Sequence, residues 1–316
     1  MDAKTILLLF SGLGLLLFSG KFLVESSVFI ARRFHISTSI IGLTIVAFGT
    51  SAPELLVSIQ AALQGYPDMA VGNVIGSNIS NILLVLGITT IIFPIAVQRS
   101  SVIVDWPVMM IASLIMLGFL VDRHLSRLEG AIFVLFLLGY ILFSLRQAKK
   151  TRTTGSDVTE SGIYKTWWMA LVVFLLSCGG LALGASLLVD NAARMAAFLG
   201  VSERVISISM VALGTSLPEL ATSIIAAFKR ETDLSIGNIL GSNLMNIISV
   251  LGITSLIKPI YTSPLVLTMD MPWVIGSAIL LFLFMIPANR GKIVRIEGVL
   301  LFIAYIIYIY FIFIVE

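Results

Sequence analysis

Hydrophobic residues along this chain fall into ten long runs separated by short polar stretches. A helix needs roughly 20 apolar residues to cross a bilayer, and each run is long enough to do so. The predicted spans lie near residues 5–31, 38–63, 69–93, 102–121, 128–146, 166–193, 203–228, 233–257, 270–287 and 295–315. The pattern predicts an all-α membrane protein with five spans in each half of the chain.

The composition excludes an ordinary soluble protein. Hydrophobic residues make up 58% of the chain and charged residues 12%, and the mean hydropathy is +1.07, which leaves too little polar surface to face water. The first run is predicted to be a retained helix and not a secretion signal, because it is long, contains Lys21 and lacks a small-residue cleavage site. Cys178 is the only cysteine, which excludes an internal disulfide and a cysteine metal cluster. No cofactor, nucleic acid or obligate protein partner is expected.

A duplication accounts for the polar residues inside the apolar runs. Residues 40–92 and 205–257 align without gaps, and 27 of the 53 aligned positions are identical. Both copies contain the motifs GTSxPE and GNxxGSN, where x is a variable position. Each copy also holds one glutamate within a long apolar run, Glu54 or Glu219. This pattern predicts an ion site built from two half-sites.

The only sizeable polar segment joins the two halves. It runs from Arg146 to Lys165, between spans five and six, so we predict a first repeat over residues 1–147, a cytoplasmic linker over 148–165 and a second repeat over 166–316. Because each repeat holds an odd number of spans, the second repeat enters the membrane from the opposite face. The predicted fold is therefore ten transmembrane helices in two five-helix repeats of inverted topology, a recurring transporter architecture.

The lysines and arginines of the loops predict the orientation. Loops on one side carry thirteen of them and loops on the other side carry six, and positive residues in short loops are held on the cytoplasmic side. We therefore expect the richer set to face the cytoplasm and both termini to lie outside, in a plasma or inner membrane.

Glu54 and Glu219 are the acidic groups expected deepest in the membrane. A carboxylate at mid-bilayer costs roughly 2.5 kcal/mol or more, and the spans contain almost no positive charge to balance it, since Lys21 is expected to pair with Glu25 on its own helix. If inverted symmetry brings the two carboxylates together, they repel each other when empty. The pair should then bind cations or take up a proton.

A proline precedes each of these glutamates. Pro53 and Pro218 lack an N–H and crowd the carbonyl four residues back, which is predicted to free the backbone carbonyls of residues 47–50 and 212–215. Carbonyls freed inside a bilayer need a partner, and a dehydrated cation near the midplane can serve as one. A kinked helix patched by Thr and Ser hydroxyls is the structural alternative.

Oxygen-bearing side chains recur four residues apart and therefore share helix faces. The stripes are Thr50, Glu54 and Ser58 with Asn73, Ser77 and Asn81 in the first copy, and Thr215, Glu219 and Ser223 with Asn238, Ser242 and Asn246 in the second. Such sets offer almost nothing but oxygen, which suits Ca2+ and Na+ better than zinc, copper or iron.

The two motifs resemble the paired α-repeats of sodium/calcium exchangers in the cation/calcium antiporter superfamily, and the ten-span layout is similar over the whole chain. The resemblance implies a prokaryotic secondary antiporter, not an enzyme, that exchanges Na+ for Ca2+ by alternating access while the first and sixth spans slide across the core. It implies that Ca2+ is held by the carboxylates of Glu54 and Glu219 and the carbonyls of Thr50 and Thr215. It places Na+ at Ala47, Ser51, Ser77, Ala212, Ser216 and Ser242, with Asn81 and Asn246 facing the middle.

Particular positions bear on the branch of the superfamily. Potassium-dependent relatives, and some prokaryotic exchangers, carry aspartate where this chain has Asn246, so the resemblance favours K+-independent exchange. Proton/calcium relatives carry a further acidic group near Ser77 and Ser242, so Na+ is favoured over H+ as the coupling ion. Two carboxylates balance one Ca2+, and three Na+ would leave one net positive charge, so the exchange is expected to be electrogenic.

Other functions are considered beside this one. An H+/Ca2+ antiporter of the same superfamily is the alternative. A passive cation channel is less favoured, because channels usually build an acidic ring from subunit symmetry. An intramembrane protease is less favoured again, because it needs catalytic aspartates or a Ser/His pair inside the membrane.

Overall fold

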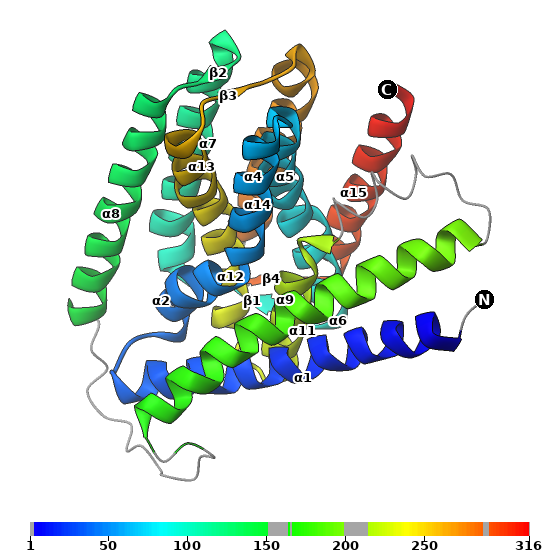
Figure 1. The fold of residues 1–316 in the computed structure, drawn as a ribbon. Coiled ribbons are helices and arrows are strands. Elements are labelled where there is room, and N and C mark those ends of the chain that lie inside the picture. Colours follow the sequence, from blue (N-terminus) through cyan, green and yellow to red (C-terminus); the bar gives the residue numbers. More distant parts are fainter. Residues whose placement is uncertain (1–2, 151–163, 165, 199–213, 287–290, 316) are drawn as a thin grey trace.

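The computed structural model describes residues 3–150, 164, 166–198, 214–286 and 291–315 (Figure 1). Within these residues, eight helices are long and apolar enough to cross a membrane, and a ninth span results if the bent pair Thr38–Thr50 and Ala52–Gln64 is counted as one. The predicted span 203–228 is described only from residue 214 onward. The protein is therefore a helical, multi-pass membrane protein, as the hydrophobic pattern predicts.

The elements follow one another in the same order in both halves. The first half contains α1 (Ala3–Arg33), α2 (Thr38–Ile41), η1 (Gly42–Val46), α3 (Ala47–Thr50), α4 (Ala52–Gln64), α5 (Pro67–Ser80), η2 (Asn81–Leu86), α6 (Gly87–Ile92), β1 (Ile95–Ala96), η3 (Ser101–Asp105), α7 (Trp106–Phe119), η4 (Leu120–Asp122), β2 (His124–Leu125) and α8 (Arg127–Lys150). The described part of the second half contains α9 (Trp167–Phe198), α11 (Leu217–Phe228), α12 (Thr232–Met245), η5 (Asn246–Leu251), α13 (Gly252–Ile257), β3 (Ile260–Tyr261), η6 (Val266–Asp270), α14 (Met271–Met285), β4 (Lys292–Ile293) and α15 (Arg295–Val315).

The duplication in the sequence is matched by the bounds of the elements. Helix α5 begins at Pro67 and α12 at Thr232, and the π-helical turns η2 and η5 begin at Asn81 and Asn246, in each case 165 residues apart. Strands β1 and β3 keep the same separation. Equal local sequences therefore fold into equal local structures, including the uncommon π turns, which often occur at functional sites.

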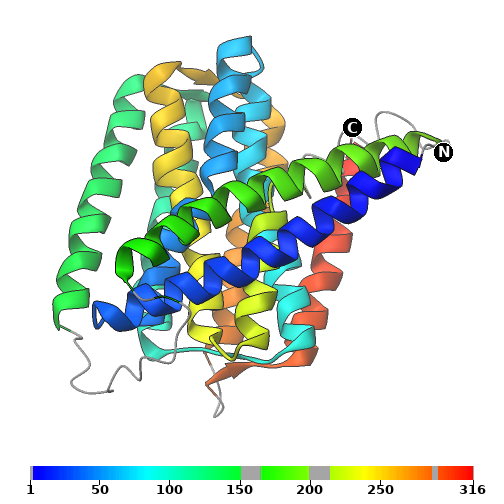
Figure 2. The same cartoon turned by 60° about the horizontal axis from the view of Figure 1, so that its bottom comes forward.

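Helices α1 and α9 form a layer of their own. They lie side by side, run in opposite directions and are strongly inclined to the other helices (Figures 1 and 2). Their backbones approach closely, since a Cβ on Gly12 would lie 2.7 Å from the backbone nitrogen of Leu188 and 2.9 Å from the carbonyl oxygen of Gly184. Their buried apolar side chains belong to two hydrophobic clusters that are separate from the main core.

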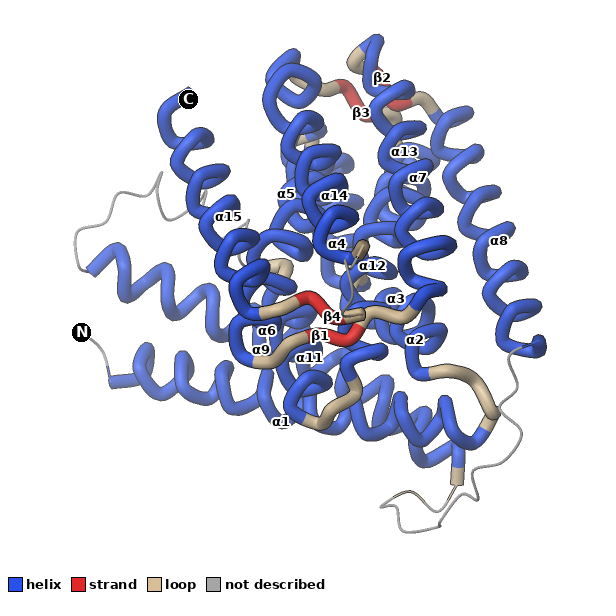
Figure 3. The backbone as a smooth tube through the Cα atoms, turned by 180° about the vertical axis from the view of Figure 1, so that it is seen from behind, coloured by secondary structure: helices blue, strands red, loops and turns tan. Residues whose placement is uncertain are grey.

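Two small sheets tie the halves together at opposite ends of the bundle (Figure 3). Strand β1 pairs antiparallel with β4, with Ile95 opposite Ile293, and β2 pairs antiparallel with β3, with His124 opposite Tyr261. Each sheet thus joins one loop from each half. The loops that pair are those that the distribution of lysine and arginine predicts to lie on the same side of the membrane.

The helices that carry the GNxxGSN motif lie at the centre of the bundle. The spans Pro67–Ile92 and Thr232–Ile257 are buried over 78% and 89% of their most apolar stretch, whereas the other candidate spans are buried over 22% to 33%. Polar side chains on these two helices therefore face protein and not lipid.

The structure corrects one predicted ion pair. Glu25 is bonded to Lys229, with 2.6 Å between Oε1 and Nζ, whereas Lys21 lies over the ring of Phe22. The prediction relied on spacing within one helix, and the actual partner follows α11 in the other half of the chain.

Candidate cation site

Both GTSxPE motifs break their helix at the serine. Ser51 has φ −85° and ψ 4°, and Ser216 has φ −87° and ψ 0°. A new helix starts immediately afterwards, with Pro53 or Pro218 in its first turn, where a missing N–H breaks no helical bond. In the first copy the axis bends by 42° at this point. The glutamate that follows each proline lies in the first turn of the new helix, at the positive end of its dipole.

The break interrupts the backbone bonding of the helix, although the carbonyl of Ala47, which was predicted to be freed, keeps its helical donor. Ser51 N donates to Ala47 O over 2.9 Å and Leu55 N to Ser51 O over 3.2 Å, and Ser51 itself belongs to neither helix, so the regular helical bonding is interrupted between Thr50 and Ala52. The Thr50 hydroxyl lies 3.3 Å from Ala47 O. The carbonyl of Ala47 thus has both a backbone donor and a hydroxyl donor, as the structural alternative of hydroxyl patching predicts.

The two glutamates lie in the interior and interact with each other. Glu54 and Glu219 are both 0% exposed, and the carboxylate of Glu54 lies within electrostatic range of that of Glu219. Ser242 Oγ donates to Glu219 Oε1 over 3.5 Å, and Thr50 and Ser51 of the other half also lie beside this carboxylate. The two acids, one from each repeat, therefore lie in the same buried region of the bundle.

Hydroxyl pairs join the two halves around these acids. Thr50 Oγ1 lies 3.3 Å from Ser242 Oγ, and Thr215 Oγ1 lies 3.0 Å from Ser77 Oγ. The two pairs are the same contact made twice, since each residue of the second pair is 165 positions from its equivalent in the first. Each half-site is thus completed by a helix from the other repeat.

Other contacts remain within one copy and hold the stripes together. Asn73 Nδ2 donates to Glu54 O over 3.2 Å and to Ser58 Oγ over 3.0 Å. In the second copy Asn238 Nδ2 donates to Ser223 Oγ over 3.4 Å. These amides fix α4 against α5 and α11 against α12, as predicted from the four-residue spacing.

Several buried polar atoms at the site have no hydrogen-bond partner within the described chain. They are both carboxylate oxygens of Glu54, Oε2 of Glu219, the hydroxyls of Ser51 and Ser216, both side-chain polar atoms of Asn81 and Oδ1 of Asn246. Leaving a buried polar group unpaired costs about 1–3 kcal/mol of folding free energy, so a bound ligand that pairs with these atoms would stabilise the protein. Because almost all are oxygens, they suit a hard cation such as Ca2+ or Na+.

The structure brings together most of the residues predicted for this site. Ala47 is buried next to the helix break. Ala212 lies outside the described residues. His, Cys, Asp and Glu side chains form no cluster of three or more in the part of the chain that the structure describes. Any cation held here would therefore depend on the two glutamates together with carbonyl, hydroxyl and amide oxygens.

Comparison with known proteins assigns the family. The family model described as sodium/calcium exchanger protein matches residues 4–146 and 169–314. The chain belongs to the sodium/calcium exchanger family. As a member of that family, it is a cation/calcium antiporter of the membrane, and the family consists of transporters and not of enzymes.

Individual relatives span nearly the whole of this family member. The putative antiporter CaxA of Alkalimonas amylolytica is 39% identical over 310 residues, which cover 96% of each chain. The sodium/calcium exchanger MaX1 of Methanosarcina acetivorans is 30% identical in an alignment of 350 positions that covers 98% of each chain. The structure of the sodium-calcium exchanger NCX_Mj soaked with Na+ and no Ca2+ superposes with a TM-score of 0.80 at 32% identity, over 98% of this chain and 99% of that one.

Two buried asparagines beside the predicted site residues of this family member were not singled out from the sequence. Asn78 and Asn243 follow Ser77 and Ser242, and both are 2% exposed. They lie off the four-residue stripes, so helical spacing did not select them. Their repetition as the last residue of GNxxGSN was the signal that could have done so.

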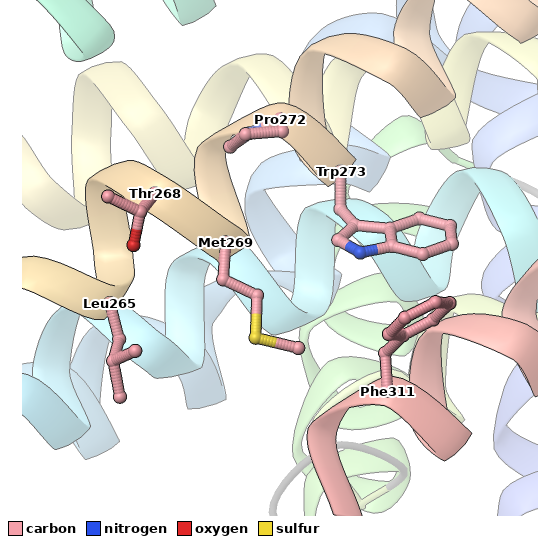
Figure 4. A pocket seen from close by; sticks show the side chains of 6 residues that line it. All are labelled: Leu265, Thr268, Met269, Pro272, Trp273 and Phe311. Carbon is pink, nitrogen blue, oxygen red and sulfur yellow. The ribbon is translucent and has the colours of Figure 1, made fainter. Parts of the chain in front are cut away.

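A separate cavity lies between the segment around η6 and α14 and the helix α15 (Figure 4). It has a volume of about 380 Å³ and is lined mainly by apolar side chains, namely Leu265, Thr268, Met269, Pro272, Trp273 and Phe311. It lies at η6, α14 and α15 and contains no acidic side chain. It is therefore not part of the cation site of this family member.

Proposed function

We propose that the protein exchanges Na+ for Ca2+ across the membrane by alternating access. The observation that carries the proposal is the pair of fully buried glutamates, one from each repeat, that interact at the centre of the bundle. Two carboxylates balance the charge of one Ca2+, and a cation between them relieves their mutual repulsion. The proposal includes ten spans in two inverted five-helix repeats, which the recurring element bounds support.

Calcium would be held by the two carboxylates and by the carbonyls of Thr50 and Thr215. The helix break at Ser51 supports this, because it interrupts the helical backbone bonding directly after Thr50. Sodium would use oxygens of Ala47, Ser51 and Ser77 and of the equivalent residues Ala212, Ser216 and Ser242. The unpartnered hydroxyls of Ser51 and Ser216 within the described chain support these positions.

Sodium is proposed as the coupling ion, without a requirement for potassium. Asn81 and Asn246 supply neutral amides at the centre, so the site holds only two negative charges from Glu54 and Glu219. A site of this charge is neutral with one Ca2+ and positive with three Na+. We therefore propose electrogenic, K+-independent exchange.

The test is calcium uptake into liposomes that contain the purified protein. Vesicles loaded with Na+ and diluted into Na+-free buffer, at equal pH on both sides, should accumulate Ca2+. When choline is the cation of the Na+-free buffer, replacing it with K+ should not change the rate of calcium uptake. An inside-positive membrane potential should accelerate uptake, because the exchange carries net positive charge outward. Uptake that ignores the Na+ gradient but follows an imposed pH gradient would establish H+/Ca2+ exchange instead.

We further propose a plasma or inner membrane location with the β1–β4 sheet in the cytoplasm and both termini outside. The pairing of loops in two sheets at opposite ends supports this grouping, and the excess of lysine and arginine supports its direction. A C-terminal alkaline phosphatase fusion should be active and a C-terminal green fluorescent protein fusion dark. The reverse result would invert the orientation.

A further inference from the structure

Asparagine amides connect the two central helices next to the proposed cation positions. Asn78 Nδ2 donates to Asn243 O and Asn243 Nδ2 donates to Asn78 O, each over 3.2 Å. This reciprocal pair links α5 and α12 one residue after Ser77 and Ser242. It repeats the symmetry of the site, since the two asparagines are 165 positions apart.

A third amide breaks that symmetry. Asn246 Nδ2 donates to Asn78 Oδ1 over 3.1 Å. In the equivalent place Asn81 makes no bond to Asn243, and within the described chain neither the polar atoms of Asn81 nor Oδ1 of Asn243 has a partner. Only one of the two central asparagines is therefore held in a set orientation.

The orientation follows from hydrogen-bond chemistry. A backbone carbonyl only accepts, so the Asn78 atom that faces Asn243 O must be its NH2 group, and its oxygen must face the other way. That oxygen also only accepts, so Asn246 must present its own NH2 to it. The carboxamide oxygen of Asn246 is consequently turned away from Asn78, and it is buried without a partner in the described chain.

The free oxygen lies in the region of the proposed cation site. Asn246 is the first residue of η5 and is 0% exposed, and η5 packs against α4, the helix that carries Glu54. We infer that Asn78 is a positioning residue, which holds Asn246 with its oxygen and not its NH2 group toward the transported cations. The inference rests on the proposed function, in which Asn246 faces the ions.

The test compares two matched variants, Asn78→Leu and Asn243→Leu. Each removes one side-chain bond to the opposite backbone, but only Asn78→Leu also releases Asn246. We expect Asn78→Leu to raise the apparent KM for Ca2+ or Na+ by roughly threefold to tenfold, the worth of one ligand interaction, with a smaller effect on the maximal rate. Asn243→Leu should leave both KM values near wild type, although it too should lower the melting temperature in detergent, because it removes one bond between α5 and α12.

A double variant separates positioning from general damage. In an Asn246→Leu background the oxygen is gone, so adding Asn78→Leu should change KM no further. Equal KM increases for Asn78→Leu and Asn243→Leu, an unchanged KM in Asn78→Leu, or additive effects in the double variant would overturn the inference. If Asn78→Leu does not fold, Asn78→Ala carries the same expectation without added bulk.

The KM for Ca2+ is measured with whichever gradient drives wild-type transport. A failure of Na+ coupling is then distinct from a failure of the role assigned to Asn78.

Discussion

In the middle of the molecule the two repeats pair their hydroxyls in the same way, whereas at the ends of α1 and α9 their contacts differ. The centre holds the Thr50–Ser242 and Thr215–Ser77 pairs at 3.3 and 3.0 Å. At one end of the bundle Glu25 is bonded to Lys229 over 2.6 Å.

A second ion pair lies at this end, between Arg32 and Glu231 at 3.3 Å. The equivalent positions at the other end, 165 residues away, are Asp190 with Gln64 and Ala197 with Tyr66, which supply no positive charge.

Packing of the long helices differs in the same way. Helix α1 lies along α11, but α9 has no comparable contact with α4 among the described residues. The two repeats thus match at the centre, where their hydroxyls pair, and differ at the ends, where their ion pairs and helix contacts are unequal. We therefore expect the residues of the matched centre to bind ions, and the residues of the unequal ends to favour one arrangement of the helices.

The largest expected effect comes from the central acids. Glu54→Gln and Glu219→Gln should each reduce sodium-driven calcium uptake at least about 100-fold, because losing a charge contact in a low-dielectric site costs a few kcal/mol. The two losses should agree within a small factor. The control is Glu129→Gln, which should transport normally. Glu129 accepts a bond from Ser126 N at the start of α8, away from the central acids. Uptake that survives either central change would reject the site.

The next effect concerns the packing that brings the repeats together. A Cβ on Gly241 would lie 2.6 Å from Leu43 O and 2.8 Å from the Cβ of Ala47, so Gly241→Ala must push η1 away from α12. We expect a loss of about 1–3 kcal/mol, measured as a lower melting temperature in detergent together with weaker exchange. Gly14→Ala, on an exposed part of α1, is the control and should not lower the melting temperature.

The paired hydroxyls should give smaller and equal effects. Ser77→Ala and Ser242→Ala each remove one side of a cross-repeat pair, and we expect each to raise the apparent KM for Na+ roughly threefold to tenfold. Na+-dependent calcium uptake measures both. A strong effect from only one of them would show that the two half-sites differ in the working protein despite their matching geometry.

The smallest effect belongs to the unequal ends. Arg32→Gln and Lys229→Gln should each change the exchange rate by less than about fivefold, because partly exposed ion pairs contribute only about 0.2–1 kcal/mol. Burial raises the pKa of Glu231, Arg32 and Lys229 oppose this, and Asp233 adds to it. Glu231 therefore takes up a proton at a higher pH than an ordinary glutamate.

The ion pair between Arg32 and Glu231 exists only while Glu231 is ionised, which means at a pH above its raised pKa. Uptake by Arg32→Gln and by the wild type, measured across a pH series with equal pH on both sides, should differ at high pH and converge as pH falls. A difference that grew on acidification would contradict this account of the pair.

Much of the site was predictable because the membrane restricts the sequence so strongly. An acid or a proline within an apolar run is costly, so Glu54, Pro53 and their repeats stand out without any structure. The helix break at Ser51 and the burial of both acids follow the prediction. The predicted Lys21–Glu25 pair was wrong because spacing along one helix cannot reveal a partner from the other repeat.

The sequence by itself determined the class of the protein, the duplication, the break in each GTSxPE helix and the oxygen character of the site, because these depend on local chemistry and on the cost of polar groups in lipid. Only the tertiary structure decided that hydroxyls pair across the repeats, that Asn78 contacts Asn246 while Asn243 does not contact Asn81, and that Glu25 is bonded to Lys229. Those contacts join residues more than 130 positions apart, and their geometry is set by how whole helices pack and not by any local pattern.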